Sequence, residues 1–178
     1  MKILLIILFV IVTLVVLLLL LALFAKKDYF VQREILVNAS INNDFEYLRF
    51  LRNQEQFSKW VMADPDMKKE FKGADGEPGF VYVWDSKKRA GAGEQLLVSL
   101  EKPNRLNMEV HFIRPFKAIA KTPFILEEKG AGQTLVKWEM HSAMNYPMNA
   151  MLLFMSADKM LGPDMEESLN NLKRILEK

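Results

Sequence analysis

The longest apolar run of the chain lies at its start, where only Lys2 and Thr13 of the first 25 residues fall outside the apolar class. The uninterrupted stretch 3–25 would extend about 34 Å as a helix, and the hydrocarbon core of a bilayer is about 30 Å thick. A secretory signal has a shorter apolar part that ends in a small-residue cleavage site, which Leu23-Phe24-Ala25 does not provide. The pattern therefore predicts a retained membrane anchor at 1–25, with a cleaved signal as the alternative.

After the anchor, polar and apolar positions become mixed, which indicates a short linker at 26–29 and one domain at 30–178. A domain of this size can bury a core of its own. Lys26, Lys27 and Arg33 follow the anchor, whereas Lys2 precedes it. The positive-inside rule therefore favours a single-pass membrane protein with a cytoplasmic domain.

The first part of the domain combines a strand with two short helical pieces. Residues 28–39 are rich in β-branched and aromatic side chains and predict a strand. The stretch 43–46, Asn-Asp-Phe-Glu, matches a capping box, so a helix is expected to begin at Asn43. A second helical piece, "QEQFSKWVM", is ended by Asp64-Pro65-Asp66.

From Met67 to Ser142 the apolar positions recur with a period of two, which is typical of strands. Glycine-rich turn signals separate the segments. Six strands are predicted: "KKEFKG", "FVYVWDS", "GEQLLVSLE", "RLNMEVHFI", "AIAKTPFILEE" and "QTLVKWEMHS". With the strand at 28–39 they make an antiparallel sheet of about seven strands, long enough to curl around whatever packs on its concave face.

The last segment, 147–178, has helical periodicity. Gly162-Pro163 interrupts it, and because proline cannot donate its backbone bond we expect a kink or restart at about Leu161. The apolar stripe before the interruption consists of Met148, Met151, Leu152 and Met155, and the stripe after it of Met165, Leu169, Leu172 and Leu176. A long final helix buried on a sheet gives an α+β layer arrangement.

Alternation along each strand predicts which side chains share the inner face. The inner sets are Leu96, Val98 and Leu100; Met108, Val110 and Phe112; Ala118, Ala120, Thr122, Phe124 and Leu126; Val136, Trp138 and Met140. The small members at 118, 120 and 122 leave room for a cavity. His111 and His141 fall on the opposite face.

Composition excludes several classes of chemistry. The chain has no cysteine and two histidines, so disulfides, thiolate catalysis and cysteine-ligated zinc are excluded, and no metal or cofactor is expected. The net charge is +2 and no basic stripe occurs, so nucleic acid is not an expected partner. Phosphate-binding loops, dinucleotide fingerprints and nucleophile elbows are also absent from the sequence.

Four stretches carry a family resemblance: "RNQEQFSKWVMADPDM", "GAGEQLLVSLEKPNRLNMEVHFIRPF", "GQTLVKWEMHSAMN" and "LFMSADKMLGPDMEESLNNLKRILE". In combination they resemble the SRPBCC superfamily, which is similar to START lipid-transfer domains, and within it the polyketide cyclase/dehydrase-like branch. The resemblance implies a helix-grip fold, in which a curved antiparallel sheet wraps around a long C-terminal helix. In this fold, a cavity lies between the sheet and the helix. It implies no catalytic residue, because the branch has no catalytic motif that maps onto this chain.

The leading hypothesis is a membrane-anchored domain that binds a hydrophobic small molecule or lipid between sheet and helix, because methionine and aromatic side chains suit an adaptable apolar pocket. The candidate lining residues are Tyr82, Trp84, Val98, Met108, Phe112, Ala120, Phe124, Trp138, Met140, Met148, Met151 and Met155. A cyclase or dehydratase and a membrane-associated interaction or stress-response module are the alternatives. Plain core packing is the competing explanation for the methionines, and protein partners are not indicated.

Overall fold

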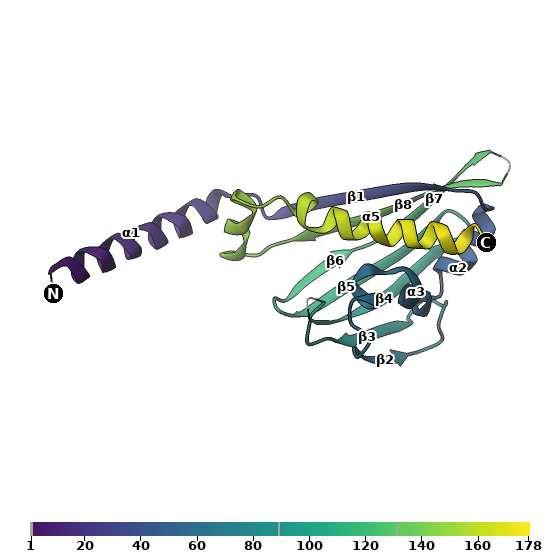
Figure 1. Ribbon diagram of the computed structural model, residues 1–178, viewed down its shortest axis with the longest axis horizontal. Coiled ribbons are helices and arrows are strands. Elements are labelled where there is room, and N and C mark those ends of the chain that lie inside the picture. Colours follow the sequence, from purple (N-terminus) through teal and green to yellow (C-terminus); the bar gives the residue numbers. More distant parts are fainter. Residues whose placement is uncertain (1, 89, 131) are drawn as a thin grey trace.

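The computed structural model describes residues 2–88, 90–130 and 132–178 (Figure 1). The helical elements are α1 (Lys2–Phe24), α2 (Ile41–Leu48), η1 (Leu51–Asn53), α3 (Gln54–Phe57), α4 (Lys59–Met62), η2 (Met148–Leu153) and α5 (Ala157–Leu176). The strands are β1 (Asp28–Val37), β2 (Lys68–Lys72), β3 (Val81–Asp85), β4 (Ala92–Glu101), β5 (Arg105–Arg114), β6 (Ala118–Lys121), β7 (Phe124–Gly130) and β8 (Gln133–Ala143). The predicted α+β architecture of a sheet with a long C-terminal helix is confirmed.

The eight strands form one antiparallel sheet in the order β1-β8-β6-β5-β4-β3-β2, so that β1 and β2 are its edges. Both β6 and β7 pair with β5 on one side and β8 on the other, so they occupy the same strand position in the sheet, one after the other. The single strand predicted for "AIAKTPFILEE" is therefore wrong. It breaks at Thr122-Pro123, because proline has no N–H to donate to the ladder.

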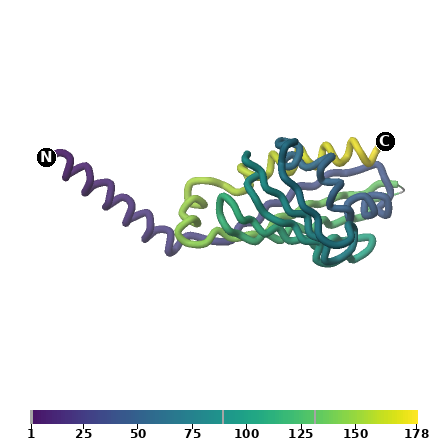
Figure 2. Tube along the Cα trace, turned by 90° about the horizontal axis from the view of Figure 1, so that it is seen from below, coloured from purple at the N-terminus to yellow at the C-terminus, as the bar shows by residue number. Residues whose placement is uncertain are grey.

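Helix α5 lies along β1 and covers the concave side of the sheet, as both views show (Figures 1 and 2). Gly162 permits this approach, since a Cβ there would lie 1.9 Å from Nη2 of Arg33. The expected restart at about Leu161 is wrong: α5 continues from Ala157 through Pro163, and the interruption lies at 154–156. The expected buried stripe of α5 is confirmed by Met165, Leu169 and Leu172.

The first domain helix begins three residues earlier than the capping box predicts. Ser40 is the N-cap of α2, and its Oγ accepts the backbone N–H of Asn43 at 3.4 Å. A serine hydroxyl at the N-cap commonly accepts a hydrogen bond from a backbone N–H of the first turn, which has no partner within the helix. Asn43 is thus inside the helix, and its expected role as the cap is wrong.

The expected inner face of β4 is wrong over residues 96–98. Leu97 is fully buried, whereas Val98 is 43% exposed. The register of β4 against β5 shifts between Leu97 and Ser99, so one extra residue lies in the strand there. A bulge reverses the alternation on its two sides, and for this reason Leu100 again packs against the core.

Helix α1 extends away from the domain (Figure 1). It is long and apolar enough to cross a membrane, and the window of 18 residues that qualifies has no buried member. A signal sequence near the N-terminus can meet the same criteria of length and composition. The chain from Ala25 to Lys27 joins α1 to the edge strand β1.

Candidate functional site

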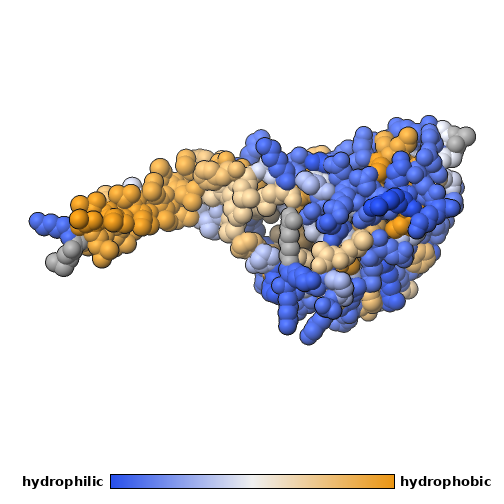
Figure 3. Space-filling view, in the orientation of Figure 1, coloured by the Kyte–Doolittle hydropathy of each residue, from blue (hydrophilic) through white to orange (hydrophobic). Residues whose placement is uncertain are grey.

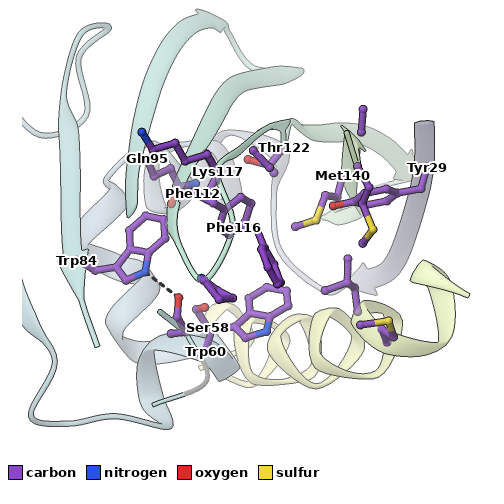
Figure 4. Close-up of a pocket in the computed structure, with 18 of the residues that line it drawn as sticks. Tyr29, Ser58, Trp60, Trp84, Gln95, Phe112, Phe116, Lys117, Thr122 and Met140 are labelled. Atoms are coloured by element: carbon purple, nitrogen blue, oxygen red, sulfur yellow. Dashed lines mark hydrogen bonds between the residues drawn. The ribbon is translucent and has the colours of Figure 1, made fainter. Parts of the chain in front are cut away.

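A cavity of about 660 Å³ lies between the inner face of the sheet and the helical side of the domain (Figure 4). The sheet contributes side chains from β1, β3, β4, β5, β6 and β8, and Gln95 and Thr122 extend from it in Figure 4. Trp60 of α4 and Ser58, which lies between α3 and α4, face them. Residues of η2 and the start of α5 also line the helical side. Small-molecule sites are typically concave and of about 300–1,000 Å³.

One wall of the cavity is built on Trp84 of β3. Its ring lies over Gly93 of the neighbouring strand, where a Cβ would come within 2.7 Å of the indole and 2.6 Å of the His111 carbonyl oxygen. The indole Nε1 donates to the carbonyl of Ala90 at 3.1 Å, drawn as a dashed line in Figure 4. Phe112 packs edge-on against the same ring at 6.3 Å. Glycine at position 93 therefore sets the position of this wall.

A second aromatic group links the sheet to the short helices. Trp138 of β8 stacks on Phe124 at 5.0 Å and meets Trp60 of α4 edge-on at 5.6 Å. Trp60, Trp84 and Trp138 are the three tryptophans of the chain, and all three line the cavity. Intrinsic tryptophan fluorescence therefore reports on this cavity and on no other part of the protein.

Two polar groups of the lining are buried without a hydrogen-bond partner among the described residues. They are Oγ1 of Thr122, a residue 1% exposed, and Nε1 of Trp138, a residue 4% exposed. Thr122 lies at the break between β6 and β7, and its backbone N–H donates to Met108. A buried polar group without a partner costs about 1–3 kcal/mol. Both atoms lie beneath the cavity surface, so a bound molecule would remove that cost only where neighbouring side chains move aside.

Two further polar side chains complete this region. Gln95 is buried, and the hydrogen bond recorded for its amide nitrogen goes to the weakly accepting Sδ of Met108 at 3.4 Å. The phenol of Tyr82 lies 3.5 Å from Oε1 of Glu55. Burial, reinforced by the Glu55 carboxylate, raises the pKa of Tyr82, so the phenol stays neutral.

Among the described lining residues, Lys117 is the one charged side chain, and it is exposed at the β5–β6 turn. The two histidines lie on the outer face of the sheet. His111 contacts Glu94 and Glu109, each at 3.3 Å, and His141 contacts Glu139 at 2.9 Å. The lining thus offers neutral donors and apolar surface to a ligand, and neither imidazole reaches it.

The methionines of the chain concentrate at the cavity. Six of the eleven line it, four of them from residues 144–160 around η2 and the start of α5. The cavity methionines are Met67, Met140, Met144, Met148, Met151 and Met160. Because the thioether is unbranched and polarisable, such a wall can repack around ligands of different shape.

Seven of the twelve candidate residues line the cavity: Tyr82, Trp84, Phe112, Trp138, Met140, Met148 and Met151. Met108, Ala120 and Phe124 are buried in the adjoining core instead. Val98 lies on the outer face beyond the β4 bulge, and Met155, 43% exposed, lies in the segment between η2 and α5. These five residues do not line the cavity, and a ligand-binding role for the twelve candidates stays a prediction.

The sequence prediction missed Gln95 on β4 and the side chains that approach from the helical side and from loops. Among the latter are Ser58, Trp60, Phe116 and Tyr146. The sequence held a signal for Gln95, because period-two alternation places Gly93, Gln95 and Leu97 on the same face of β4. That face is recognised as the inner one only if the bulge after Leu97 is taken into account. The short helices and turns have too few residues to show a periodicity, so no comparable signal existed for the others.

No protein family model and no curated protein matches the sequence. Solved structures do match. Norcoclaurine synthase from Thalictrum flavum, in complex with dopamine and hydroxybenzaldehyde, is similar with a TM-score of 0.64 and 9% identity, over 85% of this chain and 88% of that chain. Major latex-like protein 151 from Panax ginseng is similar with a TM-score of 0.62 and 11% identity, over 84% and 98%.

A hypothetical protein from Helicobacter pylori is similar with a TM-score of 0.64 and 13% identity, over 84% of this chain and 89% of that chain. At such identities the likeness concerns the fold and not the chemistry. One of these proteins is named as a synthase and the others are not, so the likeness does not decide between an enzyme and a binding protein. The curved sheet, the C-terminal helix and these neighbours together establish that the chain has the helix-grip fold.

Proposed function

We propose that this chain is a membrane-anchored binding protein for a hydrophobic small molecule or lipid that carries one uncharged hydrogen-bonding group. The observation that supports it is the cavity of about 660 Å³, whose described lining is apolar except for a few neutral polar groups and Lys117. Thr122 and Trp138 each hold an unpartnered donor just beneath this lining, which a hydroxyl or carbonyl oxygen of the ligand would reach when neighbouring side chains shift. An apolar body fills the rest.

Membrane anchorage by α1 is part of the proposal. A ligand of low solubility in water partitions into the bilayer, so a cavity held next to that reservoir needs no long diffusion through water. The length and composition of α1 support this arrangement. Assignment to the polyketide cyclase/dehydrase-like branch rests on the sequence resemblance described above.

A cyclase or dehydratase acting on a similar molecule is the second candidate, supported by the synthase among the structural neighbours. General acid–base chemistry needs a titratable group within hydrogen-bond reach of the reacting proton. The described lining contains Tyr82 and Lys117 as its titratable side chains apart from Tyr29 and Tyr146, and no carboxylate or imidazole. This lining favours binding over catalysis.

Tryptophan fluorescence tests the binding proposal directly. We expect a brominated long-chain alcohol to quench the fluorescence of the full chain in detergent micelles in a saturable manner. Ala118→Phe should fill part of the cavity and weaken binding by roughly tenfold or more, because an added ring in a packed space costs about 1–3 kcal/mol. Ala74→Phe, at an exposed position outside the cavity, is the matched control.

Two results would contradict the proposal. One is quenching of the unaltered chain that does not saturate, which would indicate no specific site. The other is equal quenching of the Ala118→Phe and Ala74→Phe chains, which would place the binding site elsewhere. Native mass spectrometry of the purified chain provides an independent measurement, because a lipid held in the cavity adds its mass to the protein.

A further inference from the structure

The end of α1 is fixed to the domain by a buried asparagine of η2. Asn149 is fully buried, and its Nδ2 donates to the carbonyl oxygens of Ala22 at 2.6 Å and Ala25 at 3.2 Å. The last carbonyls of a helix have no partner within it, so these bonds satisfy groups that would otherwise stay open. Ala22 is itself fully buried. Segment η2 therefore lies directly against the end of α1.

The residues around η2 carry an exposed apolar surface, here named the apolar rim: Tyr146, Leu153, Phe154 and Met155. Phe154 is 76% exposed, and the other three are between 43% and 46% exposed. In Figure 3 the apolar colouring of α1 continues onto the adjoining end of the domain. Contiguous apolar surface of this kind on a protein marks an interaction site.

The cavity opens beside the apolar rim. Tyr146 lines the cavity and is 44% exposed, and Phe116 of the β5–β6 turn lines it and is 55% exposed. A side chain that both lines a cavity and reaches the surface lies at its mouth. Tyr146 and Phe116 therefore both lie at the mouth, and Tyr146 belongs to the segment that leads into η2, which contacts α1.

Chain length and charge fit a lipid surface at this end. Residues 25–27 alone separate α1 from β1, a reach of roughly 10 Å at about 3.5 Å per residue. The exposed charges around the junction are mainly basic: Lys26, Lys27, Lys117 and Lys159. Asp28 is exposed there as well, and Asp158 is paired with Arg33 at 2.7 Å. Aromatic and basic side chains are those that favour the head-group region.

We propose that the apolar rim inserts into the head-group region of the same bilayer that α1 crosses, so that the mouth of the cavity opens onto lipid; this inference rests on the membrane anchorage in the proposed function. The partner is the bilayer itself. A ligand then passes from the leaflet into the cavity without entering water. Asn149 maintains this geometry by joining η2 to α1.

Fluorophores on single cysteines test the inference, because the chain has no native cysteine to interfere. The label is placed in turn at Phe154→Cys, Leu14→Cys in the middle of α1, and Glu101→Cys at the far end of β4. Each chain is inserted into nanodiscs of phosphatidylcholine and phosphatidylglycerol that contain lipids spin-labelled near the top of the acyl chain. We expect quenching at positions 154 and 14 and none at 101.

The outcomes separate the two proposals. If the label at position 14 is quenched and the label at position 154 is not, the apolar rim does not insert into the bilayer. Membrane anchorage by α1 is unaffected by that result. No quenching at 14 overturns both, and the cavity proposal is then judged by its own binding test in micelles. As a second variant, Phe154→Glu should slow transfer of brominated alcohol from nanodisc to cavity by roughly tenfold, since it removes one exposed aromatic side chain that would otherwise insert into the head-group region. Equal transfer rates would also overturn the inference.

Discussion

At the residue scale, single polar side chains determine which hydrogen bonds the cavity offers to a ligand. Thr122 illustrates this, because its hydroxyl is buried and unpartnered among the described residues, although its neighbours at 120 and 124 are purely apolar. A position that needed only packing would be filled better by valine, which has the same shape without a polar atom. The hydroxyl therefore costs stability in the empty protein, and under the proposed function it gains a partner when a ligand is bound.

This account predicts opposite effects of Thr122→Val on stability and on affinity. The free energy of unfolding should stay constant or rise. The affinity for a brominated long-chain alcohol should fall by about 2- to 12-fold, which corresponds to the loss of about 0.5–1.5 kcal/mol for one hydrogen bond. The affinity for the matched brominated alkane should not change, and tryptophan quenching measures both.

Thr134→Val is the control for that experiment. Thr134 is equally buried, but its hydroxyl donates to the carbonyl of Ala39 at 3.0 Å and does not line the cavity. This variant should lose stability and keep the preference for the alcohol. If Thr122→Val retains the same preference, the ligand's polar group is not bound at Thr122.

A second residue-scale feature lies outside the cavity. Asp44 of α2 is fully buried, and neither carboxylate oxygen has a hydrogen-bond partner among the described residues. Burial raises the pKa of Asp44 to about 6; the nearby Thr134 hydroxyl opposes this rise and the Glu177 carboxylate adds to it. The unfolded chain has the ordinary value near 3.8, so the folded state binds this proton more tightly.

The sign of the resulting pH dependence follows. Below about pH 4 the carboxyl is protonated in both states and costs nothing. Between about pH 4 and 6 the unfolded state ionises first, so the contribution of Asp44 to stability falls as pH rises, and the loss is complete above about pH 6. Asp44→Asn should therefore match the unaltered chain at pH 4 and exceed its stability at pH 7, by up to about 3 kcal/mol.

Denaturant unfolding of both chains across this pH range, followed by tryptophan fluorescence, measures that difference. Asp66→Asn, at an exposed aspartate, is the control and should show no such pH-dependent gain. A constant difference between Asp44→Asn and the unaltered chain from pH 4 to 7 would show that Asp44 does not titrate in this window.

At the scale of elements, the junction of α1 with η2 is the feature with the clearest consequence. Because Asn149 holds two carbonyls of the helix end, the direction of α1 relative to the sheet is set by side-chain bonds as well as by the short connection. Asn149→Ala should leave the fold of the domain intact and broaden the distribution of distances between spin labels at Leu14→Cys and Glu101→Cys. Pulsed electron paramagnetic resonance measures this distribution.

Asn170→Ala, at an exposed asparagine of α5, is the matched control and should leave the distribution narrow. An equally narrow distribution for Asn149→Ala would mean that the connection at 25–27 alone orients the helix. In that case the apolar rim would need another cause for its position.

The elements also show what the sequence could and could not predict. Period-two alternation identified every strand position of the sheet, because each strand buries one face. It missed the break at Thr122-Pro123, since the alternation continues across it, and it assigned the wrong face at Val98, since a bulge leaves no mark in the pattern. The candidate site was recovered where strands contribute to it. It was missed at Trp60 and Phe116, where short helices and turns place single side chains by tertiary contacts.

At the scale of the whole molecule, apolar surface is distributed unevenly. Helix α1 and the apolar rim bring exposed apolar side chains to one end, where the mouth of the cavity also lies. The remaining surface carries many ion pairs, such as Lys59 with Glu167 at 2.6 Å and Lys69 with Glu55 at 2.9 Å. Exposed pairs contribute little to stability but keep a surface soluble. This polarity agrees with a protein that meets lipid at one end and water elsewhere.

Under the proposed membrane anchorage, the edge strand β2 has a different consequence, because copies of the chain would share a bilayer. Confinement to two dimensions brings copies together far more often than free diffusion would, and an open sheet edge then invites one copy to extend the sheet of another. Lysine occupies three of the five positions of β2, at 68, 69 and 72. Like charges on two approaching edges repel, so crowding along the membrane plane would leave the copies as separate molecules rather than as a growing aggregate.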